Sequence, residues 1–231
     1  LAQMKEDFTN MMVHELRAPL TTIKQAASLL LQDKDKLTEV EQEKFLKMVR
    51  ESSDNLLNEV SDLLDAAKLE AGRLGISPVL GDIVEVIKDR VGVFMPLAEG
   101  KNINLTLDIE PNLPEISFDK TRITQVLNNL LSNALKFTKS GGSIKISAYE
   151  ENGEIKISVS DTGIGIPKEK QTALFSKFSQ IVPSAGSSGT GLGLYITRGI
   201  VEAHGGKINL ESEVGQGTTV IFFLPEKPIL L

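Results

Sequence analysis

The sequence of 231 residues contains no cysteine and no tryptophan, and it has only two histidines, His14 and His204. The absence of cysteine excludes disulfides, thiolate zinc sites and thiol catalysis. A zinc site would have to depend on carboxylates, so an enzyme of that kind is not expected. A hard cation held by oxygen ligands stays compatible with the sequence. Aromatic residues make up 5% of the chain, so the core must rest on leucine, isoleucine and valine.

The chain also lacks an excess of positive charge and a long apolar run. Its formal net charge is −6 and its pI about 5.1, which argues against nucleic-acid binding. No stretch is apolar enough for a transmembrane helix, and no signal peptide is visible. Because the sequence opens inside a helical pattern without an initiating methionine, we expect a piece of a longer protein, with further regions and any membrane anchor upstream.

The first third of the chain is free of glycine up to Gly72 and contains one proline. Apolar residues recur every three or four positions over residues 3–32 and 38–71, which predicts two long helices. The short charged loop 33–37 makes them an antiparallel hairpin. Two helices alone bury little apolar surface. We therefore expect a homodimer through residues 3–71, with a four-helix bundle shared by two chains.

The helical rhythm breaks at residues 72–81, where three glycines and a proline occur. We place the domain boundary there, with one domain over residues 1–74 and a second over 75–231. The second domain has a mixed α/β pattern. Its helices are expected over 82–99, 119–137 and 191–204, and its strands over 102–109, 143–149, 154–160, 207–212 and 218–224.

Two glycine motifs interrupt this second domain. The first follows a predicted strand and contains Asp161, Gly163 and Gly165. Its glycines would let the backbone approach a flat ligand closely, and the Asp161 carboxylate could accept a hydrogen bond from an exocyclic amine of that ligand. Residues 189–194, GTGLGL, open a helix whose free N–H groups suit a polyphosphate. The second motif is neither a Walker loop nor a dinucleotide fingerprint. Each motif alone could equally be a turn or a helix cap.

A third motif is an apolar helix that carries three asparagines, Asn128, Asn129 and Asn133. Asn129 and Asn133 are four residues apart and share a face, although asparagine costs stability inside a helix. A neutral amide oxygen can ligate Mg²⁺ whose charge is already balanced by bound phosphate groups. Lys136 could reach the same phosphates. Capping or hydrogen bonding in the core is the alternative explanation.

The fourth motif surrounds His14 in the segment HELRAPL. Pro19 removes the N–H that would bond the carbonyl of Glu15, so we expect the helix to bend there. Imidazole is nucleophilic at neutral pH, and Glu15 could orient it or accept its proton. A single histidine on a helix surface is more often inactive. For His204, which ends a helix before two glycines, we expect a structural role.

In this order, the four motifs resemble the histidine kinases of two-component systems, over residues 8–225. The resemblance implies a dimeric helical hairpin followed by an α/β two-layer sandwich, the Bergerat ATPase fold. It implies a kinase that uses ATP and Mg²⁺ to phosphorylate His14, with Glu15 as its catalytic partner. The phosphoryl group would then pass to an aspartate of a response regulator that docks near His14.

The resemblance also assigns the nucleotide site residue by residue. Asn133 is similar to the Mg²⁺ ligand of the family, Asp161 to the residue that reads the adenine amino group, and residues 179–188 to a mobile lid. The residues implied in nucleotide binding are Asn129, Asn133, Lys136, Asp161, Gly163, Gly165, Ile166, Lys177, Gly189, Thr190, Gly191, Leu192, Gly193, Leu194 and Thr218.

The sequence departs from the family pattern at Ala18 and Gln180. Relatives often carry threonine or asparagine four residues after the histidine, where it positions water for dephosphorylating the partner. Ala18 has no such group, so we expect weak phosphatase activity. Gln180 stands where many relatives have arginine, which leaves Lys177 as the nearest expected cation to the γ-phosphate. An ATP-driven clamp of the same fold and a non-enzymatic dimerisation scaffold are the two alternative functions.

Overall fold

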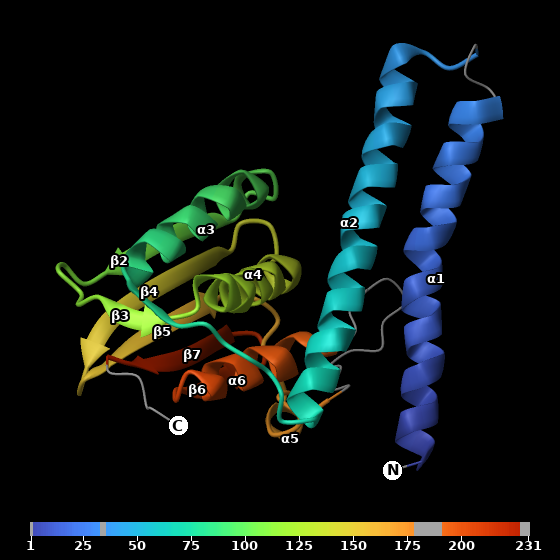
Figure 1. Ribbon diagram of the computed structural model, residues 1–231. Helices are drawn as coiled ribbons and strands as arrows, with labels where there is room; N and C mark the ends of the chain where they lie inside the picture. Colours follow the sequence, from blue (N-terminus) through green and yellow to red (C-terminus); the bar gives the residue numbers. More distant parts are fainter. Residues whose placement is uncertain (1, 33–35, 178–190, 227–231) are drawn as a thin grey trace.

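The computed structural model describes residues 2–32, 36–177 and 191–226. It consists of a long helical hairpin beside an α/β domain (Figure 1). The hairpin is formed by α1, Ala2–Gln32, and α2, Glu39–Glu70, so both predicted long helices are confirmed. Thr38 caps α2 by accepting from the backbone N–H of Glu41, whose carboxylate accepts from the N–H of Thr38 in return. Helix α1 continues through Pro19.

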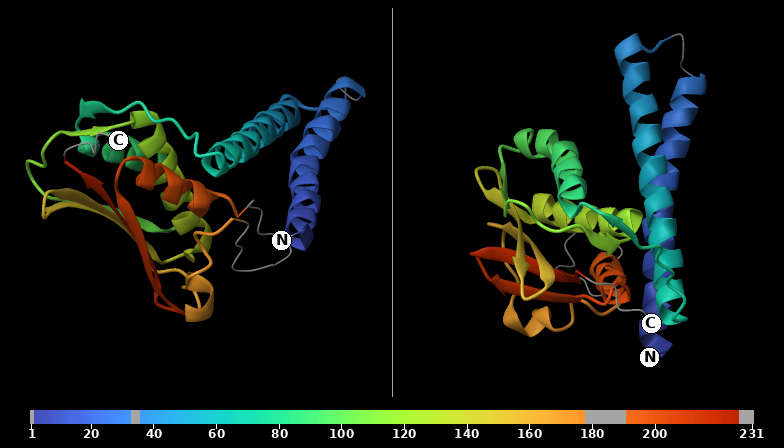
Figure 2. Two further views of the ribbon diagram at one scale, coloured as in Figure 1. Left: turned by 60° about the horizontal axis from the view of Figure 1, so that its bottom comes forward. Right: turned by 60° about the vertical axis from the view of Figure 1, so that its left-hand side comes forward.

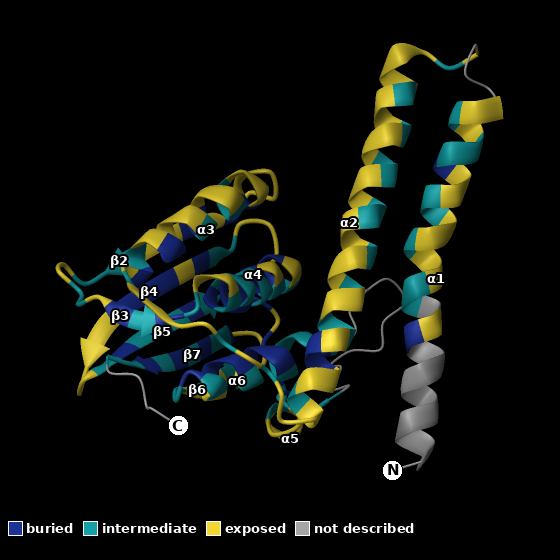
Figure 3. Cartoon of the chain, in the orientation of Figure 1, coloured by how far each residue is buried: buried dark blue, intermediate teal, exposed yellow. Residues whose placement is uncertain are grey.

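Few side chains are buried in the hairpin. Among its described residues these are Met12, Ala26, Asp65 and Ala66. Large apolar side chains stay exposed along both helices. They include Leu20, Leu31, Val40, Leu46, Leu57, Val60 and Leu64. Figure 3 shows exposed positions along the length of α2 and along the described part of α1. Among the described helices, none combines the length and the apolar character that a membrane span requires.

The α/β domain is built on a five-stranded sheet of order β2-β4-β5-β7-β6. Strands β2 and β4 are parallel, and the other neighbours are antiparallel. Helices α3, α4 and α6 cover one face, as the two views of Figure 2 show. The strands are β2, Asn104–Ile109; β4, Ser143–Glu151; β5, Glu154–Asp161; β6, Lys207–Glu213; and β7, Gly217–Pro225. The helices are α3, Ile83–Glu99; α4, Lys120–Phe137; and α6, Gly193–Ala203.

The core of this domain lies between the sheet and the three helices. It consists mainly of isoleucine, leucine and valine, as the scarcity of aromatic residues predicts. Among the described residues, the largest fully buried side chain is Phe222 of β7. These findings confirm the predicted fold class, a helical hairpin followed by a mixed α/β layer pair.

Three short elements were not predicted. Strands β1, Val79–Gly81, and β3, Ile116–Phe118, form a separate antiparallel pair, and α5, Lys168–Gln171, follows the first glycine motif. Helix α6 begins two residues later than predicted. Gly191 has a φ of +68°, outside the helical region, and so delays the start.

The base of α2 packs directly on the α/β domain. Asp65 accepts hydrogen bonds from Arg122 Nη1 at 2.6 Å and from Gln125 Nε2 at 3.0 Å, both on α4. On α6, Gly199 leaves room for the side chain of Leu69, which a Cβ at position 199 would overlap. The hairpin therefore packs on α4 and α6 at the base of α2.

His204 joins α6 to α4. Its Nδ1 donates to the carbonyl of Ile200 at 2.7 Å, and its Nε2 accepts from the backbone N–H of Asp119 at 3.0 Å. Burial lowers the pKa of His204, although the Ile200 carbonyl and the charge of Asp119 oppose that shift. Both ring nitrogens are used within the fold, as expected for a structural histidine.

Candidate functional site

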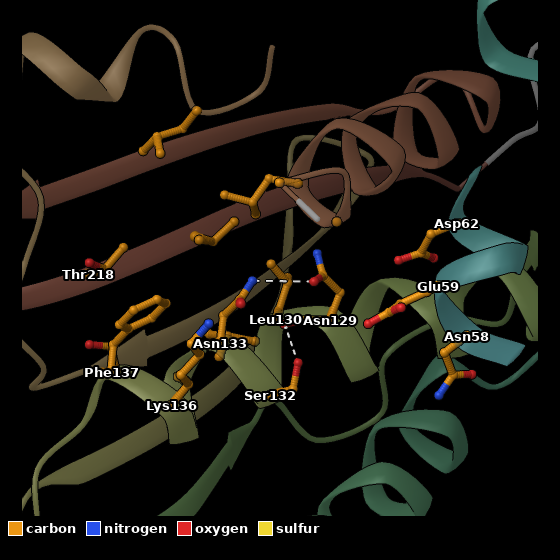
Figure 4. A pocket seen from close by; sticks show the side chains of 18 of the residues that line it. Asn58, Glu59, Asp62, Asn129, Leu130, Ser132, Asn133, Lys136, Phe137 and Thr218 are labelled. Carbon is orange, nitrogen blue, oxygen red and sulfur yellow. Dashed lines mark hydrogen bonds between the residues drawn. The ribbon is translucent and has the colours of Figure 1, made fainter. Parts of the chain in front are cut away.

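A cavity of about 760 Å³ lies where the α/β domain faces the hairpin. Its walls come from α4, the loop after β5, the start of α6 and the last strands on one side, and from α1 and α2 on the other. Figure 4 shows α4 with Asn129 and Asn133 facing Glu59 and Asp62 of α2. Most of the site residues predicted from the sequence line this one cavity. They are Glu15, Asn129, Asn133, Lys136, Asp161, Gly165, Ile166, Gly191, Gly193, Leu194 and Thr218.

Helix α4 separates its asparagines between two surroundings. Asn129, Asn133 and Lys136 line the cavity, and Asn133 Nδ2 donates to Asn129 Oδ1 at 3.3 Å. Asn128 instead accepts from Arg90 Nη1 of α3 at 3.4 Å. The pair spaced by four residues therefore belongs to the site, and the third asparagine joins two helices. Amide oxygens and an ammonium on one wall suit a cation and a polyphosphate.

Asp161 ends β5 with a partly buried carboxylate. Its Oδ1 accepts from the backbone N–H of Gly163 at 2.8 Å. Burial raises the pKa of Asp161, while hydrogen bonds from the backbone of Gly163 and Thr218 act to lower it. A carboxylate in this setting can accept a hydrogen bond from the amino group of a flat ring.

Apolar side chains form a further part of the cavity lining, an apolar slot. They are Leu130, Ala134, Val159, Ile164, Leu174, Leu210 and Val220. Ile164 lies inside the first glycine motif, and Leu174 lies in a segment that resembles the phenylalanine box of the family. For the others the only signal in the sequence is the apolar periodicity of their helix or strand, which marks burial in general. Which buried residues border a cavity depends on how the layers pack. Such a slot beside one polar acceptor is the usual form of a site for a small planar ligand.

The first glycine motif lies directly on the turn between β6 and β7. Gly165 has a φ of +66°, and a Cβ there would overlap the backbone carbonyl of Glu213. The N–H of Ile166 donates to Ser212 Oγ at 2.9 Å, and Gln171 Nε2 donates to the carbonyl of Ile166 at 2.8 Å. Ser212 and Gln171 were not predicted, because single polar residues outside a motif leave no pattern. Together these contacts fix the loop that carries the cavity wall.

The opposite wall belongs to the hairpin. From α1 it includes Glu15, Ala18, Pro19 and Thr22. The backbone of residue 14 lies in α1 directly before Glu15, and the side chain of His14 is outside the described part of the structure. The structure thus brings the segment after His14 to the same cavity as the asparagines and Asp161.

Two carboxyl groups of α2 complete this wall and were not predicted. Burial raises the pKa of Glu59, and the charges of Glu15 and Asp62 raise it further. Burial also raises the pKa of Asp62 to about 6, with a further contribution from Asp65, while a hydrogen bond with Gln125 opposes it. Both groups hold protons more readily than an ordinary carboxyl.

Some predicted residues lie away from the cavity wall. Lys177 forms an ion pair with Glu70 at the end of α2 and lies 5.7 Å from the centre of the Tyr195 ring, so it does not line the cavity. Gly163 and Leu192 are buried beside the wall without lining it. Gly189, Thr190 and the predicted lid over 179–188 lie outside the described residues.

Comparison with known proteins identifies both parts of the chain. Residues 4–72 match the family described as His Kinase A (phospho-acceptor) domain, and residues 118–228 match the Histidine kinase-, DNA gyrase B-, and HSP90-like ATPase family. The chain is 37% identical, over 98% of its length, to the circadian input-output histidine kinase CikA of Synechococcus elongatus. It covers 30% of that relative, and about a third of the length of the other curated relatives compared.

Solved structures give the same result. The catalytic domain of histidine kinase ThkA is 32% identical with a TM-score of 0.60, and the match covers 66% of this chain and 98% of that domain. ThkA in complex with the response regulator protein TrrA is 27% identical with a TM-score of 0.63. That match covers 95% of this chain and 61% of that one.

Proposed function

The chain belongs to the sensor histidine kinases of two-component systems, and we propose on this premise that it uses ATP to phosphorylate its own His14. One observation carries the proposal. The cavity that has Asn133 and Asp161 on one wall has Glu15 and Ala18 on the other. A nucleotide held by the first wall would thus meet the segment of α1 that carries His14.

ATP fits the α/β side of the cavity. Asp161 would accept from the adenine amino group, with the apolar slot on either side of the ring. Asn129, Lys136 and the N-terminus of α6 at Gly191 and Gly193 would hold the phosphates, because free backbone N–H groups favour anions there. The roles of these residues are part of the proposal.

The donor atoms also fit Mg²⁺ that arrives with the nucleotide. Among the described residues, no group of three or more histidine, aspartate or glutamate side chains could hold a metal ion alone. The wall offers instead the neutral amide of Asn133, which can add one ligand to a cation that phosphate oxygens already balance. Bound there, Mg²⁺ would neutralise the charge that develops on the phosphates.

The transfer step forms one bond and breaks one. An imidazole nitrogen of His14 attacks the γ-phosphorus, and the bond from that phosphorus to the bridging oxygen breaks, which leaves ADP. The proton displaced from the imidazole passes to the carboxylate of Glu15. The chain contributes mainly placement and charge compensation, as in other phosphoryl transfers.

The phosphoryl group would then pass from His14 to an aspartate of a response regulator that docks on the hairpin. The hairpin, residues 1–74, would act as the dimerisation and phosphotransfer domain, and residues 75–231 as the catalytic domain. The exposed apolar side chains of α1 and α2 support a homodimer through residues 3–71. Because the reaction consumes ATP, we place this part of the protein in the cytoplasm.

One experiment separates this function from its two alternatives. The chain is incubated with γ-labelled ATP and Mg²⁺, beside a His14→Gln variant. Acid-labile label on the wild type that is absent from the variant is the expected result. ATP hydrolysis without label would indicate an ATP-driven clamp, and neither binding nor label would indicate a scaffold.

A further inference from the structure

A chain of hydrogen bonds leads from the cavity into the core of the α/β domain. Asn133 Nδ2 donates to Asn129 Oδ1 at 3.3 Å, and Asn129 Nδ2 donates to Thr197 Oγ1 at 2.8 Å. The first of these bonds is drawn in Figure 4. Thr197 lies on α6 and is 1% exposed. A residue remote from solvent thus determines how two cavity residues are held.

The direction of this chain matters because an amide group has two unlike ends. Its oxygen accepts hydrogen bonds and binds cations, whereas its nitrogen only donates. The two ends have nearly the same shape, so packing alone does not decide which one faces a ligand. In Asn133 the nitrogen is turned to Asn129. The carbonyl oxygen is then the end that can face a cation.

Helix α6 holds Asn129 at two points. A Cβ at Gly193 would overlap Asn129 Oδ1, so the glycine lets the helix lie directly on the amide. Thr197 follows Gly193 by four residues and lies on the same face of α6. Gly193 makes room for the Asn129 amide because it lacks a side chain, and Thr197 binds the same amide through its hydroxyl. The last glycine of the GTGLGL motif therefore serves the asparagine pair as well as the helix N-terminus.

We propose that Thr197 is a positioning residue for the divalent cation: its buried hydroxyl orients Asn129, which orients Asn133 with its oxygen toward the metal. Thr197 itself touches neither metal nor nucleotide. This inference rests on the proposed function, because it needs a nucleotide–metal complex in the cavity. Without the hydroxyl, the Asn129 amide loses its acceptor, and the Asn133 amide can turn its nitrogen toward the metal.

A purely structural role for Thr197 makes a different prediction. Valine has nearly the same shape as threonine, so Thr197→Val would keep the core filled. A residue that only fills space would affect stability and leave metal dependence unchanged. Thr197→Ser keeps the hydroxyl and loses a methyl group, so it separates the hydrogen bond from the packing.

Thr138 offers a matched control. Its side chain is also buried in the α/β domain, at the end of α4, and its hydroxyl has no hydrogen-bond partner among the described residues. Thr138→Val makes the same chemical change in the same domain without breaking a hydrogen bond. Metal dependence should be unaffected by it.

The test is calorimetric binding of adenylyl-imidodiphosphate to the full chain, with Mg²⁺ and with a chelator. The ratio of the two affinities measures the gain due to the metal. We expect Thr197→Val to reduce this gain by about tenfold, the size expected for one well-placed hydrogen bond, with a smaller loss of affinity in chelator because Asn129 also faces the phosphates. Thr197→Ser and Thr138→Val should keep the wild-type gain.

Other outcomes overturn the inference. An unchanged gain in Thr197→Val, or an equal loss in Thr197→Ser, would show that the hydroxyl does not orient the metal ligand. An equal loss of affinity with and without Mg²⁺ would show a general effect on the site. Should Thr197→Val fail to fold, Thr197→Ala removes the same hydroxyl without placing a methyl group in its position, and the same criteria apply. If the wild type does not bind the analogue, the proposed function fails first, whatever the variants do.

Discussion

The hairpin and the α/β domain solve the problem of burial in different ways. The α/β domain encloses a continuous core in which many side chains, such as Ile157 and Phe222, are fully buried. The hairpin leaves Leu57 at 68% and Leu64 at 58% exposed, and the base of its helix α2 is covered by α4 and α6. Apolar burial contributes about 25 cal/mol per Å², so the α/β domain can be stable by itself, whereas the hairpin needs a further surface to cover its exposed apolar side chains.

Because the core lies in the α/β domain and His14 lies on the hairpin, stability and the proposed phosphoryl transfer depend on different parts of the chain. The α/β domain carries the residues proposed to hold the nucleotide, and the hairpin places Glu15 and Ala18 on the opposite wall of the cavity. The cavity lies between the two, so its wall on the hairpin side depends on how the hairpin is held. Substitutions in the two parts should therefore have different kinds of effect.

The largest expected effect is a loss of core packing in the α/β domain. Phe222→Ala should lower the free energy of unfolding by about 3–5 kcal/mol, because it removes a fully buried ring. Leu57→Ala on the hairpin should act only where two copies associate. Urea unfolding at low and high protein concentration checks both. Phe222→Ala should destabilise at every concentration, and a concentration-independent loss of that size in Leu57→Ala would contradict the comparison.

Breaking the contact between the two parts should have the next largest effect. Asp65→Ala removes the carboxylate that accepts from Arg122 and Gln125 and leaves Arg122 Nη1 only the side-chain oxygen of Gln125 as acceptor, which should cost about 1–3 kcal/mol. The control is Glu51→Ala, which removes an exposed pair with Lys47 and should cost less than about 0.5 kcal/mol. Hydrogen exchange in the first turns of α4 and chemical unfolding measure the difference. Equal effects of the two substitutions would show that the base of α2 is not fixed to α4.

A smaller loss of stability should appear on acidification, because His204 is protonated. Because burial lowers its pKa in the folded state, His204 contributes stability that is present above its ordinary pKa, near 6.5, and is lost as the pH falls through the folded value. His204→Gln should cost about 1–2 kcal/mol at neutral pH and reduce the loss of stability on acidification.

Asp62 changes stability with pH in the opposite direction to His204, so its effect must be removed from the comparison. Its pKa is raised to about 6 in the folded state. Its contribution to stability is therefore present below its ordinary pKa, near 3.8, and is lost as the pH rises through about 6. The His204 comparison is therefore best made in an Asp62→Asn background, by urea unfolding at neutral and mildly acidic pH. If stability depended on pH in the same way with and without His204, the lowered pKa of His204 would be contradicted.

The smallest effect on stability should come from Ala18, which is exposed on α1. Ala18→Thr should change unfolding by less than about 0.5 kcal/mol. It should nevertheless raise dephosphorylation of the phosphorylated response regulator, because the hydroxyl can position water at the cavity. The rate of phosphate release from the regulator, with wild-type chain as the reference, measures this. Rapid dephosphorylation by the wild type would refute the prediction of weak phosphatase activity.

Much of the fold could be predicted because its signals are local. Periodicity over 3–32 and 38–71 gave both hairpin helices, and alternation gave the five strands of the main sheet. Strands β1 and β3 were missed because each has three residues and is stable only through pairing across a long separation, with Val79 opposite Phe118. No local pattern in either segment indicates the other.

The motifs indicated part of the cavity lining, and the rest of the lining depends on packing. The glycine motifs and the spacing of Asn129 and Asn133 pointed to residues that line one wall of the cavity. Glu59 and Asp62 reach the cavity only because α2 docks on α4, which no pattern in α2 reveals. Lys177 was expected near the γ-phosphate as the nearest cation in sequence, but in the structure it pairs with Glu70. Nearness along the chain does not determine which acidic group a flexible lysine meets.

The central claim is that residue 14 is the acceptor served by this cavity. The direct measurement is mass spectrometry of the full chain after incubation with ATP and Mg²⁺, with digestion at neutral or mildly alkaline pH to keep phosphohistidine intact. We predict one added phosphoryl group, on the peptide that contains His14, and its absence when Asn133→Ala is used. A phosphoryl group on any other residue, or none on a wild type that binds ATP, would contradict it.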